Sequence, residues 1–132
     1  MPNKAIFWDF DGTLVHSTPL WSNSVFKAVG GESNPYGITF AGVRTYMKSG
    51  FPWHAYNNDY SHLINEAWWE FMHALLTSVC LKLGLDKEQA EQAAAKVRGY
   101  IMDSANYTIY DDASYALEKC MELGYKNYIL SN

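Results

Sequence analysis

A short apolar run that leads into two closely spaced carboxylates constrains this chain more than any other feature of its sequence. The run covers residues 5–8 and is followed by Asp9 and Asp11, in the segment Ala-Ile-Phe-Trp-Asp-Phe-Asp-Gly-Thr-Leu. A run this short is too short for a helix, so it predicts a buried strand that ends near Asp9. Extended backbone directs side chains two positions apart to the same side, and we therefore expect both carboxylates to act on one substrate.

This pair of carboxylates suits phosphoryl transfer in two steps. One carboxylate can attack phosphorus to give an aspartyl phosphate, while the second carboxyl protonates the leaving oxygen and later activates water. A carboxylate and a phosphate dianion repel each other, so the chemistry calls for a hard cation such as Mg²⁺ between them. Gly12 lets the backbone approach the phosphate closely.

Two other interpretations of the same residues compete with a catalytic one. Asp11-Gly12 between two apolar runs is also the pattern of a tight hairpin turn, and the pattern alone leaves this alternative open. A calcium loop of the EF-hand type fits poorly, because Leu14 and Leu20 stand where such a loop needs glycine and a bidentate glutamate.

The rest of the chain is predicted to hold helices and one further strand. Apolar spacing, caps and breakers predict helices over 19–29, around 43–47, over 63–83, from 86 through 97, and from about 111 to 123, and then a strand over 125–130. This order favours an α/β fold in which a parallel sheet is interrupted by a helical insertion. The expected domains are a partial Rossmann-like core, 1–14 with 101–132, and a helical region, 15–100.

Specific side chains support two of these helices. One face of the longest helix is predicted to carry apolar residues at helical spacing, which are Ile64, Trp68, Phe71, Leu75 and Val79. Gly84 is a plausible end of that helix, and Asp86 with Gln89 has the spacing of a capping box for the next one.

With both ends of the chain considered, the sequence resembles the haloacid dehalogenase superfamily. The segment Asp-Phe-Asp-Gly-Thr-Leu after an apolar strand is similar to the family's first motif. The segment Gly-Tyr-Lys-Asn-Tyr-Ile-Leu-Ser-Asn, residues 124–132, is similar to its second motif, a strand that ends in Ser or Thr. The helical insertion just after the first motif resembles the cap of the superfamily's first subclass, which closes over the site and selects the substrate.

The resemblance implies a role for each matching residue. Asp9 is the nucleophile and a magnesium ligand, and Asp11 is the acid/base, whose backbone carbonyl also reaches the metal. Ser131 hydrogen-bonds the transferring phosphoryl group, and main-chain amides around Phe10 and Asn132 add donors to it. Thr13 supports the loop and favours a phosphatase over a sugar-phosphate mutase, and an Asp at position 11 points to phosphoryl transfer rather than dehalogenation.

Composition and charge narrow the partners. Hydrophobic residues make up 48% of the 132 residues and charged residues 18%, as in an ordinary globular protein with a packed core. The net charge of −4 comes without a basic run, which argues against nucleic acid and anionic membranes as partners. No apolar run is long enough to span a membrane and no secretory segment is recognisable, so a cytoplasmic location is expected.

The helical region offers candidate contacts with substrate. Arg44 and Lys48 are four residues apart on an expected helix and could both face an anionic group, although such spacing also describes a solvated face. The adjoining segment 49–54 is a candidate specificity loop, in which His54 is expected to be a hydrogen-bonded structural residue rather than a ligand.

The resemblance covers only the front half of the family's fold. The lysine of a third motif and the acidic residues of a fourth are expected beyond Ser131, so we expect a truncated chain that is inactive or impaired, with sheet edges that favour self-association. The leading hypothesis is a magnesium-dependent phosphatase of a small phosphorylated metabolite. A phosphotransferase such as a mutase on the same fold, and a non-catalytic binding protein, remain alternatives.

Overall fold

The computed structural model describes residues 4–16 and 19–131, which form two compact units. Unit 1 lies within 1–18 and 104–132, and unit 2 spans 19–103. The expected boundaries fell at 14/15 and 100/101. The difference arises because Val15–His16 (β2) pairs antiparallel with Thr108–Ile109 (β3), which joins residues 15 and 16 to unit 1.

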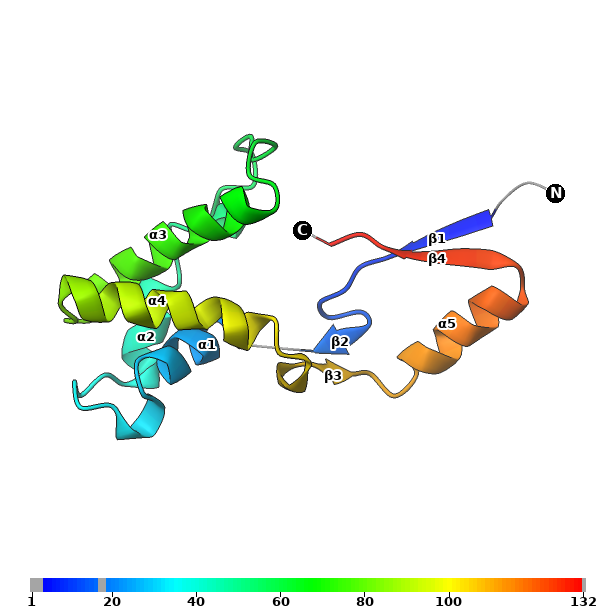
Figure 1. The fold of residues 1–132 in the computed structure, drawn as a ribbon. Coiled ribbons are helices and arrows are strands. Elements are labelled where there is room, and N and C mark those ends of the chain that lie inside the picture. Colours follow the sequence, from blue (N-terminus) through cyan, green and yellow to red (C-terminus); the bar gives the residue numbers. More distant parts are fainter. Residues whose placement is uncertain (1–3, 17–18, 132) are drawn as a thin grey trace. The chain divides into compact units, whose positions relative to one another are not determined.

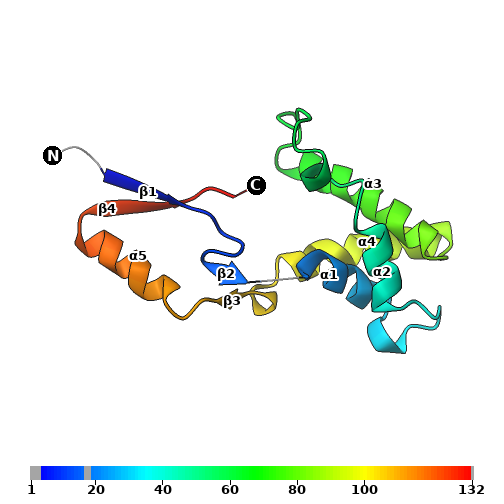
Figure 2. The ribbon, with the colours of Figure 1, turned by 180° about the vertical axis from the view of Figure 1, so that it is seen from behind.

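Unit 1 is built on two parallel strands that are far apart in the sequence. Lys4–Trp8 (β1) pairs with Tyr125–Ile129 (β4), in a register that places Lys4 opposite Tyr125 and Trp8 opposite Ile129. The helix Ala113–Glu122 (α5) precedes β4 and packs against it, as Figures 1 and 2 show. The predicted α/β fold with a parallel pair is therefore confirmed.

The prediction that the first strand is buried was wrong. Ile6 and Trp8 are half-buried, whereas Phe7 on the opposite face is 65% exposed and stacks on Tyr128, with 5.4 Å between ring centroids. Among the described residues α5 is the only α-helix of unit 1, beside the short 3-10 helix Ser104–Asn106 (η3), and it covers one face of a sheet of two strands. Self-association through the open strand edges stays a prediction.

Unit 2 is a helical bundle with its own core. Its elements are Leu20–Ala28 (α1), Gly31–Ser33 (η1), Phe40–Tyr46 (α2), Pro52–His54 (η2), Glu66–Lys82 (α3) and Lys87–Ile101 (α4). The helix α4 packs against both α1 and α3, and α2 packs against α1 and α3 (Figure 1). No helix among the described residues has the length and apolarity that a membrane crossing requires.

Local signals explain where the helices of unit 2 begin and end. Asp86 accepts from the Gln89 amide at 2.8 Å, and the Gln89 side chain accepts from the Asp86 amide at 3.0 Å, so the predicted capping box is confirmed. Gly84 ends α3 with φ 100°, a conformation that glycine adopts without strain. In unit 1, Asp112 precedes α5, but its side chain makes no capping hydrogen bond.

The predicted apolar face of α3 was partly wrong. The helix begins at Glu66, so Ile64 lies before it and is exposed. The buried residues of α3 are Met72, Leu76, Val79 and Cys80, because α4 and α2 contact α3 along a stripe turned from the predicted one. A helix that is apolar over most of its circumference gives a poor indication of which stripe is buried.

Replacement of Leu76 by Ala is expected to destabilise unit 2 by about 2–5 kcal/mol, because Leu76 is 2% exposed and its removal leaves a cavity. Leu81→Ala is the matched control, since Leu81 lies on the same helix but is 46% exposed. Urea unfolding followed by far-ultraviolet circular dichroism measures both. Equal losses of stability in the two variants would show that α3 is packed differently.

The two cysteines are expected to differ in reactivity. Cys80 is fully buried, and burial raises the pKa of its thiol to about 11, whereas Cys120 is only half-buried. Because the thiolate is the reacting form, Cys120 should react first with a disulfide reagent at pH 8, and Cys80 mainly when the protein unfolds. Cys120→Ser should remove the fast phase, and a fast phase that persists would contradict this assignment.

Candidate active site

Asp9 and Asp11 lie in a tight turn at the carboxyl end of β1. Asp9 follows β1 directly and is exposed, and its Oδ1 accepts a hydrogen bond from the Phe10 amide at 2.9 Å. The Phe10 carbonyl accepts from the next amides along the turn, those of Thr13 (3.3 Å), Leu14 (3.0 Å) and Val15 (3.2 Å). These bonds fix the path of the backbone through both carboxylate positions.

The turn requires glycine at position 12. Gly12 has φ 80°, and its amide donates to the Val15 carbonyl at 2.7 Å. A tight turn is therefore present at Asp11-Gly12, as one alternative proposed. However, β1 pairs in parallel with β4, and β2 pairs with β3, so the turn does not connect a hairpin of β1 and β2 in the described chain.

The end of β4 lies beside the end of β1. The Leu130 amide donates to the Trp8 carbonyl at 2.8 Å, which continues the ladder by one residue, and Ser131 follows and is exposed. Parallel strands end at the same edge of a sheet, so Asp9 and Ser131 are brought to one edge. Asn132, the other expected residue of this segment, lies outside the described residues.

A bridging amide that the sequence did not indicate holds this edge together. The Asn127 Oδ1 accepts from the Trp8 indole N–H at 2.9 Å, and its Nδ2 donates to the Leu117 carbonyl at 3.0 Å. Asn127 thereby joins β1, β4 and α5. An Asn inside an expected strand gives no local signal of this role, because its partners are distant in sequence.

Tyr107 is a second residue that sequence reasoning missed. Its ring lies 5.8 Å from that of Phe10, and both pack on the small core of unit 1. Burial, and secondly the negative charge of Asp11, raise the pKa of the Tyr107 hydroxyl. The Asp11 carboxylate is thus close enough to Tyr107 to affect its ionisation. Thr13 is exposed at the turn.

The candidate cations of the helical region are both in unit 2 and both exposed. Arg44 lies in α2, whereas Lys48 lies beyond its end, since α2 stops at Tyr46. Neither has an ion-pair partner in the part of the chain that the structure describes. His54 is hydrogen-bonded, as predicted, because its Nδ1 accepts from the Phe51 amide at 3.2 Å.

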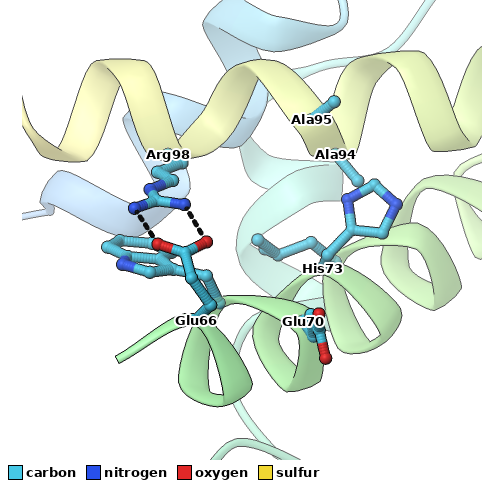
Figure 3. Close-up of a pocket in the computed structure, with 8 residues that line it drawn as sticks. Glu66, Glu70, His73, Ala94, Ala95 and Arg98 are labelled. Carbon is cyan, nitrogen blue, oxygen red and sulfur yellow. Dashed lines mark hydrogen bonds and ion pairs between the residues drawn. The ribbon is translucent and has the colours of Figure 1, made fainter. Parts of the chain in front are cut away.

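A pocket of about 290 Å³ lies between α3 and α4 and is lined by Glu66, Glu70, His73 and Arg98 among others (Figure 3). Arg98 donates to both carboxylate oxygens of Glu66, at 2.7 and 2.8 Å, and its guanidinium lies 4.9 Å from the centre of the Trp69 ring. The two charges therefore neutralise each other. The residues of this ion pair are separated by 32 positions, which no local pattern reveals.

The donors at the turn are of the kind that Mg²⁺ prefers. Asp9 and Asp11 supply carboxylate oxygens, and Mg²⁺ is ordinarily held by one or two carboxylates together with water and phosphate oxygens. Within 4–16 and 19–131 no three His, Cys, Asp or Glu side chains are grouped as a metal site. The chemistry of these two residues fits Mg²⁺ if water and phosphate oxygens complete its coordination.

Gly12→Ala is expected to destabilise the turn by about 1–2 kcal/mol, because φ 80° is strained for an L residue. A Cβ at position 12 would meet no atom within 4 Å, so the cost is conformational. Gly99→Ala is the matched control, since Gly99 lies inside α4 with equally open space and should gain stability. Urea unfolding followed by the amide NMR signals of residues 4–16 and of α4 measures both changes. If residues 4–16 of Gly12→Ala unfold at the same urea concentration as in the parent protein, this geometry of the turn is contradicted.

Comparison with known proteins identifies the fold. A crystal structure described as a predicted phosphoglycolate phosphatase from Haemophilus somnus 129PT matches with a TM-score of 0.51 and 17% sequence identity. The match covers 98% of this chain and 52% of that one, so this chain spans about half of the length of that structure. No curated protein matches the sequence significantly.

The sequence itself matches a family model over almost its whole length. The model describes a haloacid dehalogenase-like hydrolase and matches residues 3–132, which include both carboxylates of the turn and the end of β4. The chain belongs to the haloacid dehalogenase-like hydrolases.

Proposed function

We propose that this protein is a phosphatase that hydrolyses a small phosphorylated metabolite through an aspartyl phosphate on Asp9. The observation that carries the proposal is the meeting of Asp9 and Ser131 at one edge of the β1–β4 pair, where the Leu130 amide bonds to the Trp8 carbonyl. Asp9 and Ser131 at one edge support a site in which the Asp9 carboxylate acts as nucleophile and the Ser131 hydroxyl binds a phosphoryl oxygen. The proposal concerns the whole protein, since the chain covers 52% of its structural relative.

The two carboxylates divide the chemistry between them. Asp9 attacks phosphorus, a bond forms between its carboxylate oxygen and phosphorus, and the bond from phosphorus to the ester oxygen breaks. Asp11 gives its proton to the departing alcohol oxygen. In the second step Asp11 takes a proton from water, the water oxygen attacks phosphorus, and Asp9 is released with inorganic phosphate.

The turn orients the nucleophile before the reaction. The Phe10 amide holds Asp9 Oδ1 at 2.9 Å, which leaves Oδ2 as the oxygen without that constraint. A fixed carboxylate loses less freedom on reaching the transition state than a mobile one. Phe10 was expected to contribute its amide to the phosphoryl group. In this structure that amide donates its hydrogen bond to Asp9 Oδ1. We propose that Ser131 and Thr13 contact the phosphoryl oxygens instead.

Asp9 and Asp11 are the residues that would hold Mg²⁺. When bound, the ion offsets the repulsion between a carboxylate and a phosphate dianion. We propose Arg44 and Lys48 as contacts with an anionic part of the substrate, because both are exposed and have no ion-pair partner among the described residues.

Asp9→Asn should lower hydrolysis of p-nitrophenyl phosphate on the order of 10³-fold or more, since it removes the nucleophile. The assay includes Mg²⁺ and is made on the 132-residue chain and on the complete gene product. Glu118→Gln is the control, because it removes the same charge from an exposed position on α5. Acid quenching and mass spectrometry should find one phosphoryl group on the peptide that contains Asp9.

The fate of that phosphoryl group separates this proposal from a transferase. Discharge to water supports the phosphatase, whereas discharge only to an added sugar phosphate would replace it with a mutase. Hydrolysis that survives Asp9→Asn, with no phosphorylated peptide, would contradict the proposal.

A further inference from the structure

A second pocket of unit 2 has the size and lining of a small-molecule site. It has a volume of about 560 Å³ and lies between the segment 49–63 and α3. Pockets that bind small ligands ordinarily measure about 300–1,000 Å³ and have an apolar base with a few polar groups. Here the base is formed by Phe51 and Pro52, which are buried, and by Leu63. We call it the Tyr60 pocket.

Two aromatic rings form walls of the Tyr60 pocket. The rings of Tyr60 and Phe71 are 6.4 Å apart between centroids and inclined by 59° to each other. The Tyr60 hydroxyl donates to the Ala55 carbonyl at 3.0 Å and accepts from the Asn58 side chain at 3.4 Å. These bonds hold the ring in place before a ligand arrives. The faces of fixed aromatic rings attract cations.

A carboxylate on the rim gives the pocket its charge. Hydrogen bonds from the Ser61 hydroxyl and amide, the latter at 2.8 Å, lower the pKa of Asp59, which therefore carries a negative charge at neutral pH. His54 also lines the pocket, and its Nδ1 accepts a hydrogen bond from the Phe51 amide. His62, the other imidazole of the lining, lies near Asp59.

The lining discriminates between classes of ligand. Every residue of the lining is described, and no lysine or arginine is among them, so a phosphate or carboxylate would meet no permanently charged cation there. This differs from the pocket between α3 and α4, where Arg98 neutralises Glu66. In the Tyr60 pocket the carboxylate of Asp59 has no lysine or arginine beside it. A cation with an apolar body would meet both the carboxylate and the rings.

We propose that the Tyr60 pocket binds a small organic cation, an ammonium group carried on a short apolar chain. The ammonium group lies against the faces of Tyr60 and Phe71, with Asp59 as its counter-ion, and the apolar part rests on Phe51 and Leu63. The site belongs entirely to unit 2. The proposal therefore does not depend on the phosphatase chemistry of Asp9.

Choline and its neutral isostere 3,3-dimethylbutan-1-ol test the proposal, because they share a shape and differ in charge. Each is titrated into the ¹⁵N-labelled 132-residue chain at pH 8, and amide shifts report where it binds. Choline is expected to shift the amides of segment 49–63 and of Phe71 with a Kd of roughly 1–10 mM. The alcohol should bind about tenfold more weakly, because it lacks the attraction of the rings and the carboxylate.

Two variants locate the contribution of each group. Asp59→Asn should weaken choline binding about tenfold and leave the alcohol unchanged, and Phe71→Leu should weaken choline more than the alcohol. Glu32→Gln is the control, since it removes the same charge from unit 2 at an exposed position outside the pocket. The ¹⁵N spectra show that each variant remains folded.

Four outcomes would overturn the proposal. The first is equal binding of choline and the alcohol, the second is the lack of saturation by choline at about 50 mM, and the third is that the amide shifts lie outside the Tyr60 pocket. Equal weakening by Asp59→Asn and Glu32→Gln would likewise show that only the overall charge of the chain attracts choline.

Discussion

The hydrogen-bonded ladder between β1 and β4 is the interaction on which unit 1 and its candidate site depend. It pairs residues 4–8 with residues 125–129 and so brings the two family motifs together. Parallel strands need a crossover connection, and here the crossover includes the whole of unit 2. Asn127 adds to the ladder, because one side chain joins β1 through Trp8 and α5 through Leu117. Loss of that amide would leave two polar partners without a bond, at about 1–3 kcal/mol each when they are buried.

Much of the fold follows from local signals, and these were the parts that the sequence predicted well. Gly84 and the capping box of Asp86 act on their immediate neighbours, so the end of α3 and the start of α4 can be predicted from the sequence. The pairing of β2 with β3 was missed, because each strand has only two residues and no alternation can be recognised in so short a run. The exposure of β1 was missed for another reason. The burial of a strand depends on whether one or both faces of its sheet are covered by other elements. A run of apolar residues does not indicate which of the two applies.

The candidate site also contains some residues that local sequence motifs indicate and others that only tertiary contacts bring to it. Asp9 and Asp11 were proposed as site residues because a motif places them two positions apart at the end of a strand, and Ser131 because it follows the end of another strand. Their catalytic roles stay predictions. Tyr107 and Asn127 belong to the same region through tertiary contacts, with partners that local spacing does not indicate. Asp59 is a comparable case in unit 2. Its charge is ordinary for a surface residue, and only the rings of Tyr60 and Phe71 around it give it a possible ligand.

The separation of β1 from β4 in the sequence also bears on the order in which the chain can fold during synthesis. Lys4 leaves the ribosome long before Tyr125, so β1 must wait for its partner with the side chains of Ile6 and Trp8, which are half-buried in the fold, still uncovered. Unit 2 is contiguous, and its first and last helices, α1 and α4, pack against each other. Once it has folded, a flexible loop is replaced by a compact body, which lowers the entropic cost of closing the ladder. The inserted helices therefore shorten the search that ends with Asp9 and Ser131 at one edge of the β1–β4 pair.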